Sequence, residues 1–149
     1  MILALTIITT LCIGLLIGTE FSVSVFINPI LRRLDGIAQA RAIPLFARRL
    51  GAAMPFWYAA GLLLLVSEAI IYRHESGDVL LIIASAIWIA VIIQSIVILV
   101  PIANRMAQLN SDAFPQEAQR EYNKWDRLHR FRVAALVAAM VCHLVAVSI

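Results

Sequence analysis

Four long, nearly uncharged apolar runs decide what this chain can fold into. They occupy positions 2–27, 51–72, 79–100 and 131–149. A helix rises about 1.5 Å per residue, so each run is about long enough to cross a hydrocarbon core of roughly 30 Å. With 62% hydrophobic residues in 149, little is left for a soluble domain. The sequence therefore predicts an all-α protein, a single membrane domain of four transmembrane helices in an antiparallel bundle.

The charged residues are as unevenly distributed as the apolar ones. Eleven of the twelve Lys and Arg residues lie in segments 28–50 and 101–132, and the remaining one, Arg73, lies between the second and third runs. Positively charged connections stay in the cytoplasm. We therefore expect an integral membrane protein, of a bacterial inner membrane, with both termini on the non-cytoplasmic side. The basic residues flank spans, so anionic lipid headgroups of the bilayer explain the pI near 9.3 and no nucleic-acid partner is expected.

The connections between the runs differ in length and character. Segment 36–41 predicts a short interfacial helix, after which Pro44 and Pro55 start or kink the second span. Residues 56–58, Phe-Trp-Tyr, fall where an aromatic belt at the membrane surface is expected. No helix breaker follows Pro115, so we expect the fourth helix to run unbroken from there to the C-terminus, with its first turns extended into the cytoplasm.

Polar side chains inside the predicted spans are costly in hydrocarbon, and this makes them candidate site residues. Glu20 lies eight residues before Asn28, which is about 12 Å from the end of the first span. Gln94 lies at about the same depth, roughly 10 Å from the end of the third span. Glu68 is nearer the outer end of the second span, where we expect its carboxylate to reach water by snorkelling.

A polar stripe is predicted along the fourth helix. Trp125, His129 and Arg132 are spaced i, i+4 and i+7, which places them on one helical face. Met140 and His143 return to within about 40° of the same direction. The stripe should face the bundle rather than the lipid.

Small residues in the first span suggest close packing with another helix. Gly14 and Gly18 form a small-xxx-small pair, which allows either a contact inside the chain or a homodimer. Cys12 and Cys142 lie in spans without metal-type spacing, and we expect them to serve packing.

Two short motifs carry a resemblance to a known family. Pro101-x-x-Asn104 ends the third span, and Trp125-x-x-x-His129-x-x-Arg132 leads into the fourth. Together with Asn28-Pro29 at the end of the first span, this pattern resembles the anthrone-oxygenase-like family of small four-span membrane proteins. The resemblance covers nearly the whole chain. It implies an all-helical domain, with oxygenation of anthrone-type aromatic polyketides known in some members.

The first functional reading is an oxygenase or oxidoreductase acting on a lipophilic aromatic small molecule of anthrone or quinol type, in a pocket open to the cytoplasmic side. Glu20 or His129 would remove a proton, and Arg132 would stabilise the resulting anion. The remaining candidate substrate-binding residues are polar or aromatic groups near the same depth: Gln94, Asn104, Trp125 and Asn28. No protein-bound metal is expected, and this chemistry requires no cofactor when the carbanion is well delocalised.

Two alternatives stay open. His129 and His143 are about 21 Å apart along one face, a separation that suits two haem b groups in an electron-transfer protein. Each haem would then need a second ligand, from a partner chain in a dimer or from Met. A non-catalytic membrane scaffold would account for the basic segments and the aromatic residues, but not for a buried Glu20.

The charge distribution gives a testable topology. Single cysteines introduced at positions 35 and 77 should be labelled by membrane-impermeant reagents from the cytoplasm and from the opposite side, respectively. Labelling of position 77 from the cytoplasm would overturn the predicted orientation.

Overall fold

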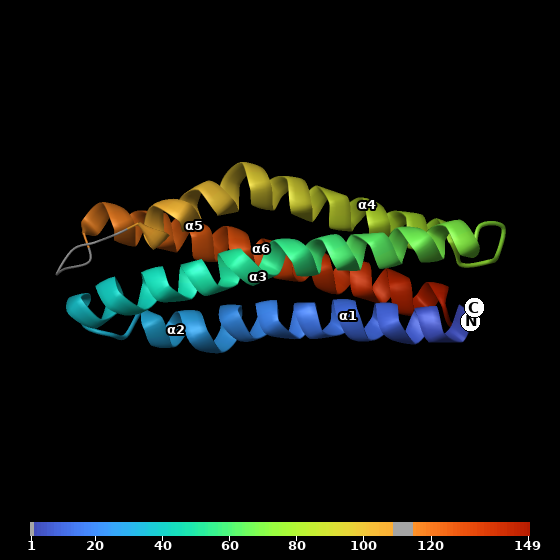
Figure 1. The fold of residues 1–149 in the computed structure, drawn as a ribbon, viewed down its shortest axis with the longest axis horizontal. Coiled ribbons are helices and arrows are strands. Elements are labelled where there is room, and N and C mark those ends of the chain that lie inside the picture. Colours follow the sequence, from blue (N-terminus) through green and yellow to red (C-terminus); the bar gives the residue numbers. More distant parts are fainter. Residues whose placement is uncertain (1, 109–114) are drawn as a thin grey trace.

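Helices account for almost all of the computed structural model, which describes residues 2–108 and 115–149 and contains no strand within them. The elements are α1 (Ile2–Ser22), η1 (Val23–Ile27), α2 (Asn28–Leu31), α3 (Gly36–Ile71), α4 (Asp78–Gln94), η2 (Ser95–Leu99), α5 (Val100–Ala107) and α6 (Gln116–Ala146). The first three elements form one continuous rod, and so do α4, η2 and α5, while α3 and α6 are each a rod of their own (Figure 1). The four resulting rods are long and apolar enough to cross a membrane, so the predicted all-α four-span bundle is confirmed and the chain is an integral membrane protein.

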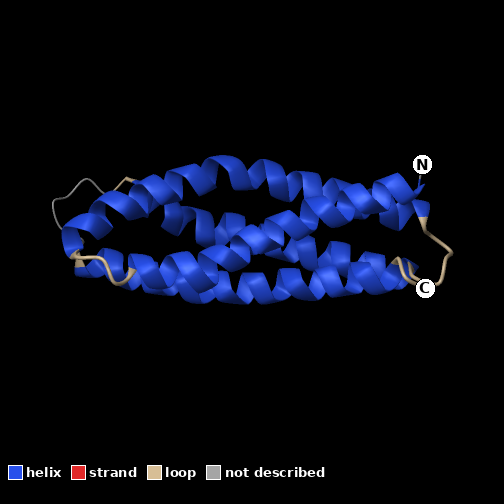
Figure 2. Cartoon of the chain, turned by 90° about the horizontal axis from the view of Figure 1, so that it is seen from below, coloured by secondary structure: helices blue, strands red, loops and turns tan. Residues whose placement is uncertain are grey.

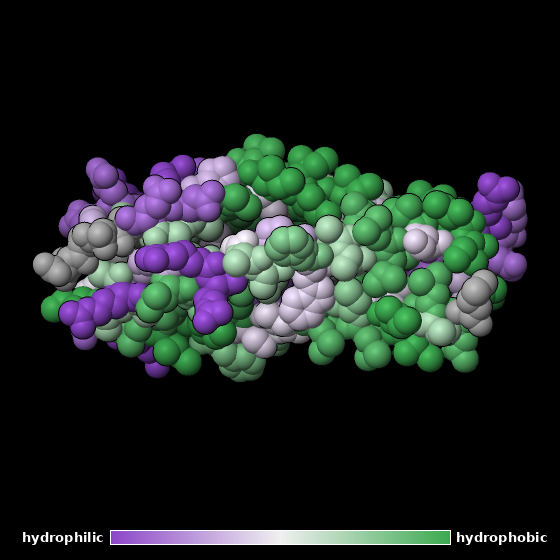
Figure 3. Space-filling view, viewed as in Figure 1, coloured by the Kyte–Doolittle hydropathy of each residue, from purple (hydrophilic) through white to green (hydrophobic). Residues whose placement is uncertain are grey.

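The rods form an antiparallel bundle in which each has two close neighbours. Helix α1 lies beside α3 and α6, and α4 lies beside the same two helices. Both termini lie at one end, here called the terminal end, together with the turn between α3 and α4 (Figures 1 and 2). The opposite end, here called the basic end, holds the turn between α2 and α3 and the start of α6. Hydrophilic side chains gather at both ends and a hydrophobic band lies between them (Figure 3).

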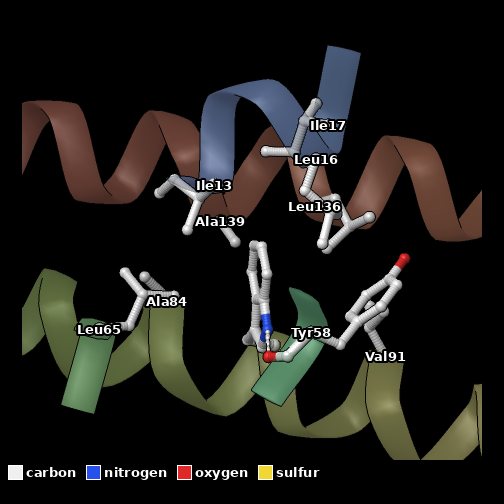
Figure 4. Packing of buried hydrophobic residues seen from close by; sticks show 10 residues of the cluster. Ile13, Leu16, Ile17, Tyr58, Leu65, Ala84, Val91, Leu136 and Ala139 are labelled. Atoms are coloured by element: carbon white, nitrogen blue, oxygen red, sulfur yellow. Dashed lines mark hydrogen bonds between the residues drawn. The ribbon is translucent and has the colours of Figure 1, made fainter. Parts of the chain in front are cut away.

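Trp88 of α4 is the centre of the larger apolar core. Its side chain is completely buried, and its indole N–H donates to the backbone carbonyl of Tyr58 at 3.0 Å. Figure 4 shows Ile13 and Leu16 from α1 and Leu136 from α6 around this contact. A buried indole N–H needs such an acceptor, because leaving it unpaired would cost about 1–3 kcal/mol. The bond therefore fixes the depth of α3 relative to α4.

Two π-helical turns widen the first and third rods just before a proline. In η1 the N–H of Asn28 donates to the carbonyl of Val23, and in η2 the N–H of Val100 donates to the carbonyl of Ser95. The next residue in each rod is proline, Pro29 or Pro101, which lacks an N–H and would clash with the carbonyl four residues earlier. The wider turn accommodates the ring without ending the helix. The second π turn and its proline follow the first pair by 72 residues. The first and third rods therefore contain the same combination of a π turn and a proline.

Helix α3 differs from the prediction. Instead of a short interfacial helix followed by a separate span, one helix runs from Gly36 to Ile71 with Pro44 and Pro55 inside it. Neither proline starts or ends a helix. The carboxylate of Asp35 caps the N-terminus by accepting from the N–H groups of residues 37 and 38. Packing against α1, α4 and α5 holds the helix through its prolines. The fourth helix, by contrast, is one unbroken element as predicted.

The turn at the terminal end leaves no room for a side chain at Gly77. A Cβ there would lie 2.3 Å from the backbone oxygen of Ala146. Cysteine labelling is therefore better carried out at the exposed Ser76, with exposed Gln108 for the basic end, since Asp35 is a helix cap.

The close approach of α3 and α4 gives a prediction on stability. A Cβ at Gly61 would lie 2.6 Å from the Trp88 ring, whereas a Cβ at Gly51 on the same helix would meet nothing within 4 Å. Gly61→Ala should therefore destabilise the protein by about 1–3 kcal/mol through overpacking. Gly51→Ala, the matched control, should be neutral or slightly stabilising. Thermal unfolding in one detergent measures both, and equal melting temperatures would contradict the packing described here.

Candidate functional site

A buried ion pair joins α1 and α6 between the core and the basic end. Arg132 Nη2 donates to Glu20 Oε2 at 2.6 Å, and the phenol of Tyr58 donates to Glu20 Oε1 at 2.9 Å. Arg132 Nη1 reaches the hydroxyl of Ser95, the first residue of η2, at 3.2 Å. Glu20 is only 2% exposed. The cluster of Glu20, Tyr58, Ser95, His129 and Arg132, here called the Glu20 cluster, therefore draws on every rod.

The imidazole of His129 completes this cluster. Its Nε2 lies 3.1 Å from the backbone oxygen of Glu20, which can only accept, so Nε2 carries the proton. The lone pair on Nδ1 then accepts from Arg132 Nη2 at 2.9 Å. Arg132 Nη2 has two hydrogens, one for Glu20 and one for His129, and Nδ1 of His129 also lies 3.2 Å from Glu20 Oε2. Within the Glu20 cluster, Arg132 Nε is buried and has no hydrogen-bond partner among the described residues.

Aromatic stacking holds the imidazole in place. The Trp125 ring stacks on His129 with centroids 4.8 Å apart and planes 8° from parallel. Tyr122 stacks on the other side of Trp125 at 6.4 Å. Offset stacking of this kind contributes about 0.5–1.5 kcal/mol beyond the area buried. Trp125 therefore lines and orients the cluster.

A second polar cluster lies one to two turns nearer the basic end. The carboxylate of Asp126, 2% exposed, accepts from Asn28 and pairs with Arg32, with both contacts at 2.5 Å. Arg130 lies 3.3 Å from the same carboxylate, and Tyr122 donates to Asn28 Oδ1 at 3.1 Å. Asn28, a predicted site residue, thus belongs to this second cluster and does not contact Glu20 in the structure.

A third buried group lies toward the terminal end, and it corrects one prediction. Glu68 is completely buried and does not reach water. Its Oε2 lies 3.0 Å from Nδ1 of His143, although hydrogen-bond geometry is not met, and neither carboxylate oxygen has a hydrogen-bond partner in the part of the chain that the structure describes. His143 Nε2 lies 3.0 Å from the hydroxyl of Thr10. The prediction that Glu68 reaches water was wrong. Helix α6 places the imidazole of His143 at the same depth, so the Glu68 side chain turns inward.

Gln94 and Asn104 do not join the Glu20 cluster. Gln94 is half-buried and makes no hydrogen bond among the described residues, while its neighbour Ser95 faces Arg132 instead. Asn104 is exposed on α5. Ser95 follows the buried Trp88 and Val91 at helical spacing, whereas Gln94 lies one residue off this buried stripe.

Tyr58 and Asp126 are the functional candidates that sequence reasoning missed. Tyr58 was assigned to a surface belt, but only Phe56 of that triplet is strongly exposed, at 79%, whereas Tyr58 is 6% exposed. Asp126 lies three residues before His129 and four after Tyr122, so the helical spacing already placed it on the buried face.

The two histidines do not fit the haem alternative. Both rings are buried, at 1% and 0% exposure, and every ring nitrogen faces a protein group. His129 faces Glu20 and Arg132, and His143 faces Glu68 and Thr10. An axial haem ligand needs one nitrogen directed at the iron. Neither histidine has a ring nitrogen that is free to point at an iron atom.

The Glu20 cluster combines a carboxylate, a buried guanidinium with a spare N–H and an oriented imidazole. A carboxylate is suited to accept a proton from carbon or oxygen, and a guanidinium is suited to stabilise an oxyanion. The same groups also connect all four rods. They therefore stabilise the packing of the helices and are also suited to proton transfer and to binding an anion.

Comparison with known proteins identifies one relationship. The family described as anthrone oxygenase matches residues 44–142, about two thirds of the chain. Tyr58, Ser95, His129 and Arg132 lie inside the matched region, whereas Glu20 lies before it. No curated protein and no solved structure matches.

The ion pair gives a prediction on stability. Glu20→Leu leaves Arg132 buried with its main partner gone, so it should destabilise the protein by about 3–5 kcal/mol. The double variant Glu20→Leu/Arg132→Leu should recover much of this loss, because it removes both charges together. Unfolding of the single and double variants in the same detergent measures the coupling. Additive losses in the double variant would show that the two side chains do not interact.

Proposed function

Because the chain belongs to the anthrone oxygenase family, we propose that it oxidises a lipid-soluble anthrone- or quinol-type ring at the Glu20 cluster. The family assignment makes it an oxygenase-like membrane protein. The observation that supports a catalytic role for this cluster is the buried Glu20–Arg132 pair whose guanidinium keeps one N–H, on Nε, without a partner.

The chemistry needs a base and an anion-stabilising donor close together. In an anthrone, loss of a methylene proton makes the ring aromatic and moves negative charge to the ketone oxygen. The carboxylate of Glu20 would accept that proton. Arg132, through Nε or a guanidinium hydrogen released by Glu20, would donate to the oxyanion.

Molecular oxygen is the oxidant in this proposal. The carbanion carbon transfers electrons to O₂ and forms a C–O bond, giving a peroxide. Return of the proton from Glu20 and loss of water leave a second ring ketone. The balance is one CH₂ and one O₂ converted to one C=O and one H₂O. Delocalisation over the ring system makes the carbanion reactive toward O₂ without a metal or an organic cofactor.

Of the two predicted bases, the geometry favours Glu20 over His129. Nε2 of His129 is committed as a donor to the carbonyl of Glu20, and the Nδ1 lone pair is directed at Arg132. His129 is therefore proposed as a positioning residue that orients Arg132. We propose further that the substrate enters through a pocket open to the cytoplasmic side. This requires the predicted orientation, in which the basic end of the bundle faces the cytoplasm.

Turnover of anthrone tests the proposal. Purified protein in lipid nanodiscs should consume one O₂ per anthraquinone formed, faster than nanodiscs without protein. Glu20→Gln should lower turnover by about 10²–10⁴, as expected for loss of a general base. Glu121→Gln, which removes an exposed carboxylate paired with Arg105, is the matched control and should retain full activity.

Arg132→Lys separates catalysis from structure in the same assay. Lysine keeps the charge but not the planar fork of donors, so turnover should fall by about 10²–10³ while the protein stays folded. If the cluster served only to hold the helices together, as in a scaffold, folded Glu20→Gln and Arg132→Lys would turn over anthrone like the wild type. Oxidation of anthrone and of a quinol no faster than in empty nanodiscs would reject the enzymatic proposal.

A further inference from the structure

The pair of Glu68 and His143 is buried at the terminal end of the bundle, and the proposed oxidation does not use it. Both side chains are completely buried, and Glu68 Oε2 lies 3.0 Å from His143 Nδ1. Both carboxylate oxygens and Nδ1 lack a hydrogen-bond partner among the described residues. Most buried polar atoms in proteins are paired, because burial removes their hydrogen bonds to water. The charge state of this pair therefore decides whether it can stay buried.

The half of the bundle around the pair contains almost no other charge. Among its Asp, Glu, Lys and Arg residues are only Glu68 and Asp78, within segments 2–19, 59–71, 78–93 and 133–146 of the rods. Asp78 begins α4, and its carboxylate accepts from the backbone N–H of His74 at 3.3 Å. These segments therefore contain no Lys or Arg side chain that could neutralise a carboxylate at position 68.

The elements packed around the pair contribute uncharged polar groups. From α1, the hydroxyl of Thr10 lies 3.0 Å from Nε2 of His143. From α4, the hydroxyl of Ser85 donates to the carbonyl of Leu81 in its own helix. The other titratable side chains of this half are two thiols and one phenol, which are ordinarily neutral at pH 7: Cys12, Cys142 and Tyr72. The charged residues of the turn at this end, Arg73 and Glu75, are exposed to water.

We propose that Glu68 and His143 hold one proton between them, and that this proton latches α1, α3 and α6 together at the terminal end. With the proton present, one group donates to the other and the pair is neutral as a whole. Without it, a bare carboxylate faces the lone pair of a neutral imidazole at 3.0 Å, and the two repel each other. An unneutralised carboxylate is among the most costly groups to bury.

A proton fits this pair better than a metal ion does. A divalent metal ion would leave a net positive charge in an apolar interior, because Glu68 is its only anionic partner there. A structural metal site also usually has four protein ligands, and a catalytic one has three. Among the described residues, no group of three His, Cys, Asp or Glu side chains could hold a metal ion.

The imidazole of His143 is the centre of this latch because it contacts two other rods. Its Nε2 faces Thr10 of α1, and its Nδ1 faces Glu68 of α3. Loss of the proton removes the second contact, so α3 is no longer held to α6 at this depth. The site is separate from the Glu20 cluster, since Thr10 and Glu20 lie ten residues, or about 15 Å, apart along α1.

Water at the terminal end can exchange this proton. Glu68 and His143 lie about one turn before the ends of α3 and α6, which are at Ile71 and Ala146. Thr10 lies one turn after Thr6, whose hydroxyl lies 3.1 Å from the phenol oxygen of Tyr72. Thr6, Thr10 and Tyr72 are half-buried, so their hydroxyls lead from the surface toward His143. The packing of this end thus depends on the pH of the water that it meets.

Unfolding of the wild type and of Glu68→Gln at several pH values tests the proposal. In an unfolded chain, Glu and His release their protons around their ordinary pKa values of about 4.3 and 6.5. Folding above pH 7 is then linked to the uptake of one proton, so stability should be lost as pH rises. The folding equilibrium constant of the wild type, relative to that of Glu68→Gln, should fall about tenfold per pH unit between about pH 7 and 9.

Two further variants provide the controls. Glu75→Gln removes an exposed carboxylate at the same end and should keep the pH dependence of the wild type. Glu68→Leu/His143→Leu removes both polar groups together, so it should fold and should lack this pH dependence even if Glu68→Gln does not fold.

Two results would overturn the proposal. The first is the same pH dependence in the wild type and in whichever of Glu68→Gln and the double variant is folded. The second is a stoichiometric metal ion, found by elemental analysis in the purified wild type and absent from the double variant. The pair would then bind that metal ion and not a proton. Neither result depends on turnover of anthrone, so the latch and the enzymatic proposal are tested separately.

Discussion

The pairing of Glu20 with Arg132 is the interaction on which the rest of the bundle depends. Two charges buried between apolar helices are tolerated only when each has a close partner and further hydrogen bonds. Tyr58, Ser95 and His129 supply those bonds from α3, η2 and α6. The pair therefore fixes the depth and rotation of all four rods at one level, and any chemistry at this level has a rigid frame.

The π turns η1 and η2 let two rods continue through prolines in the sequence. Each precedes a proline that would otherwise end its rod. Ser95, which contacts Arg132, is the first residue of η2 and the last of the buried stripe that runs along α4. In the first rod Glu20 and Asn28 lie eight residues apart on either side of η1, so the one predicted site becomes two clusters connected by the stacked rings of α6.

Part of the candidate site was predictable because helical spacing is regular. Trp125, His129 and Arg132 share a buried face, and the same rule would have included Asp126. Tyr58 and Glu68 were misjudged for a different reason. Aromatic residues near span ends and carboxylates within reach of water are usually surface groups, and only the neighbouring helix decides whether such a side chain turns inward. For Glu68 that neighbour is His143, and for Tyr58 it is Glu20.

The sequence by itself determined the class of fold. Apolar runs of span length permit only helices in a bilayer, because every backbone N–H and C=O must be bonded within its own segment. It also indicated that Glu20 and Arg132 would need burial, since both interrupt or border those runs. The tertiary structure decided which of them meet. Ion pairs and stacking act over a few ångströms, so partners more than a hundred residues apart, such as Glu20 and Arg132, are chosen by the depth and rotation of packed helices.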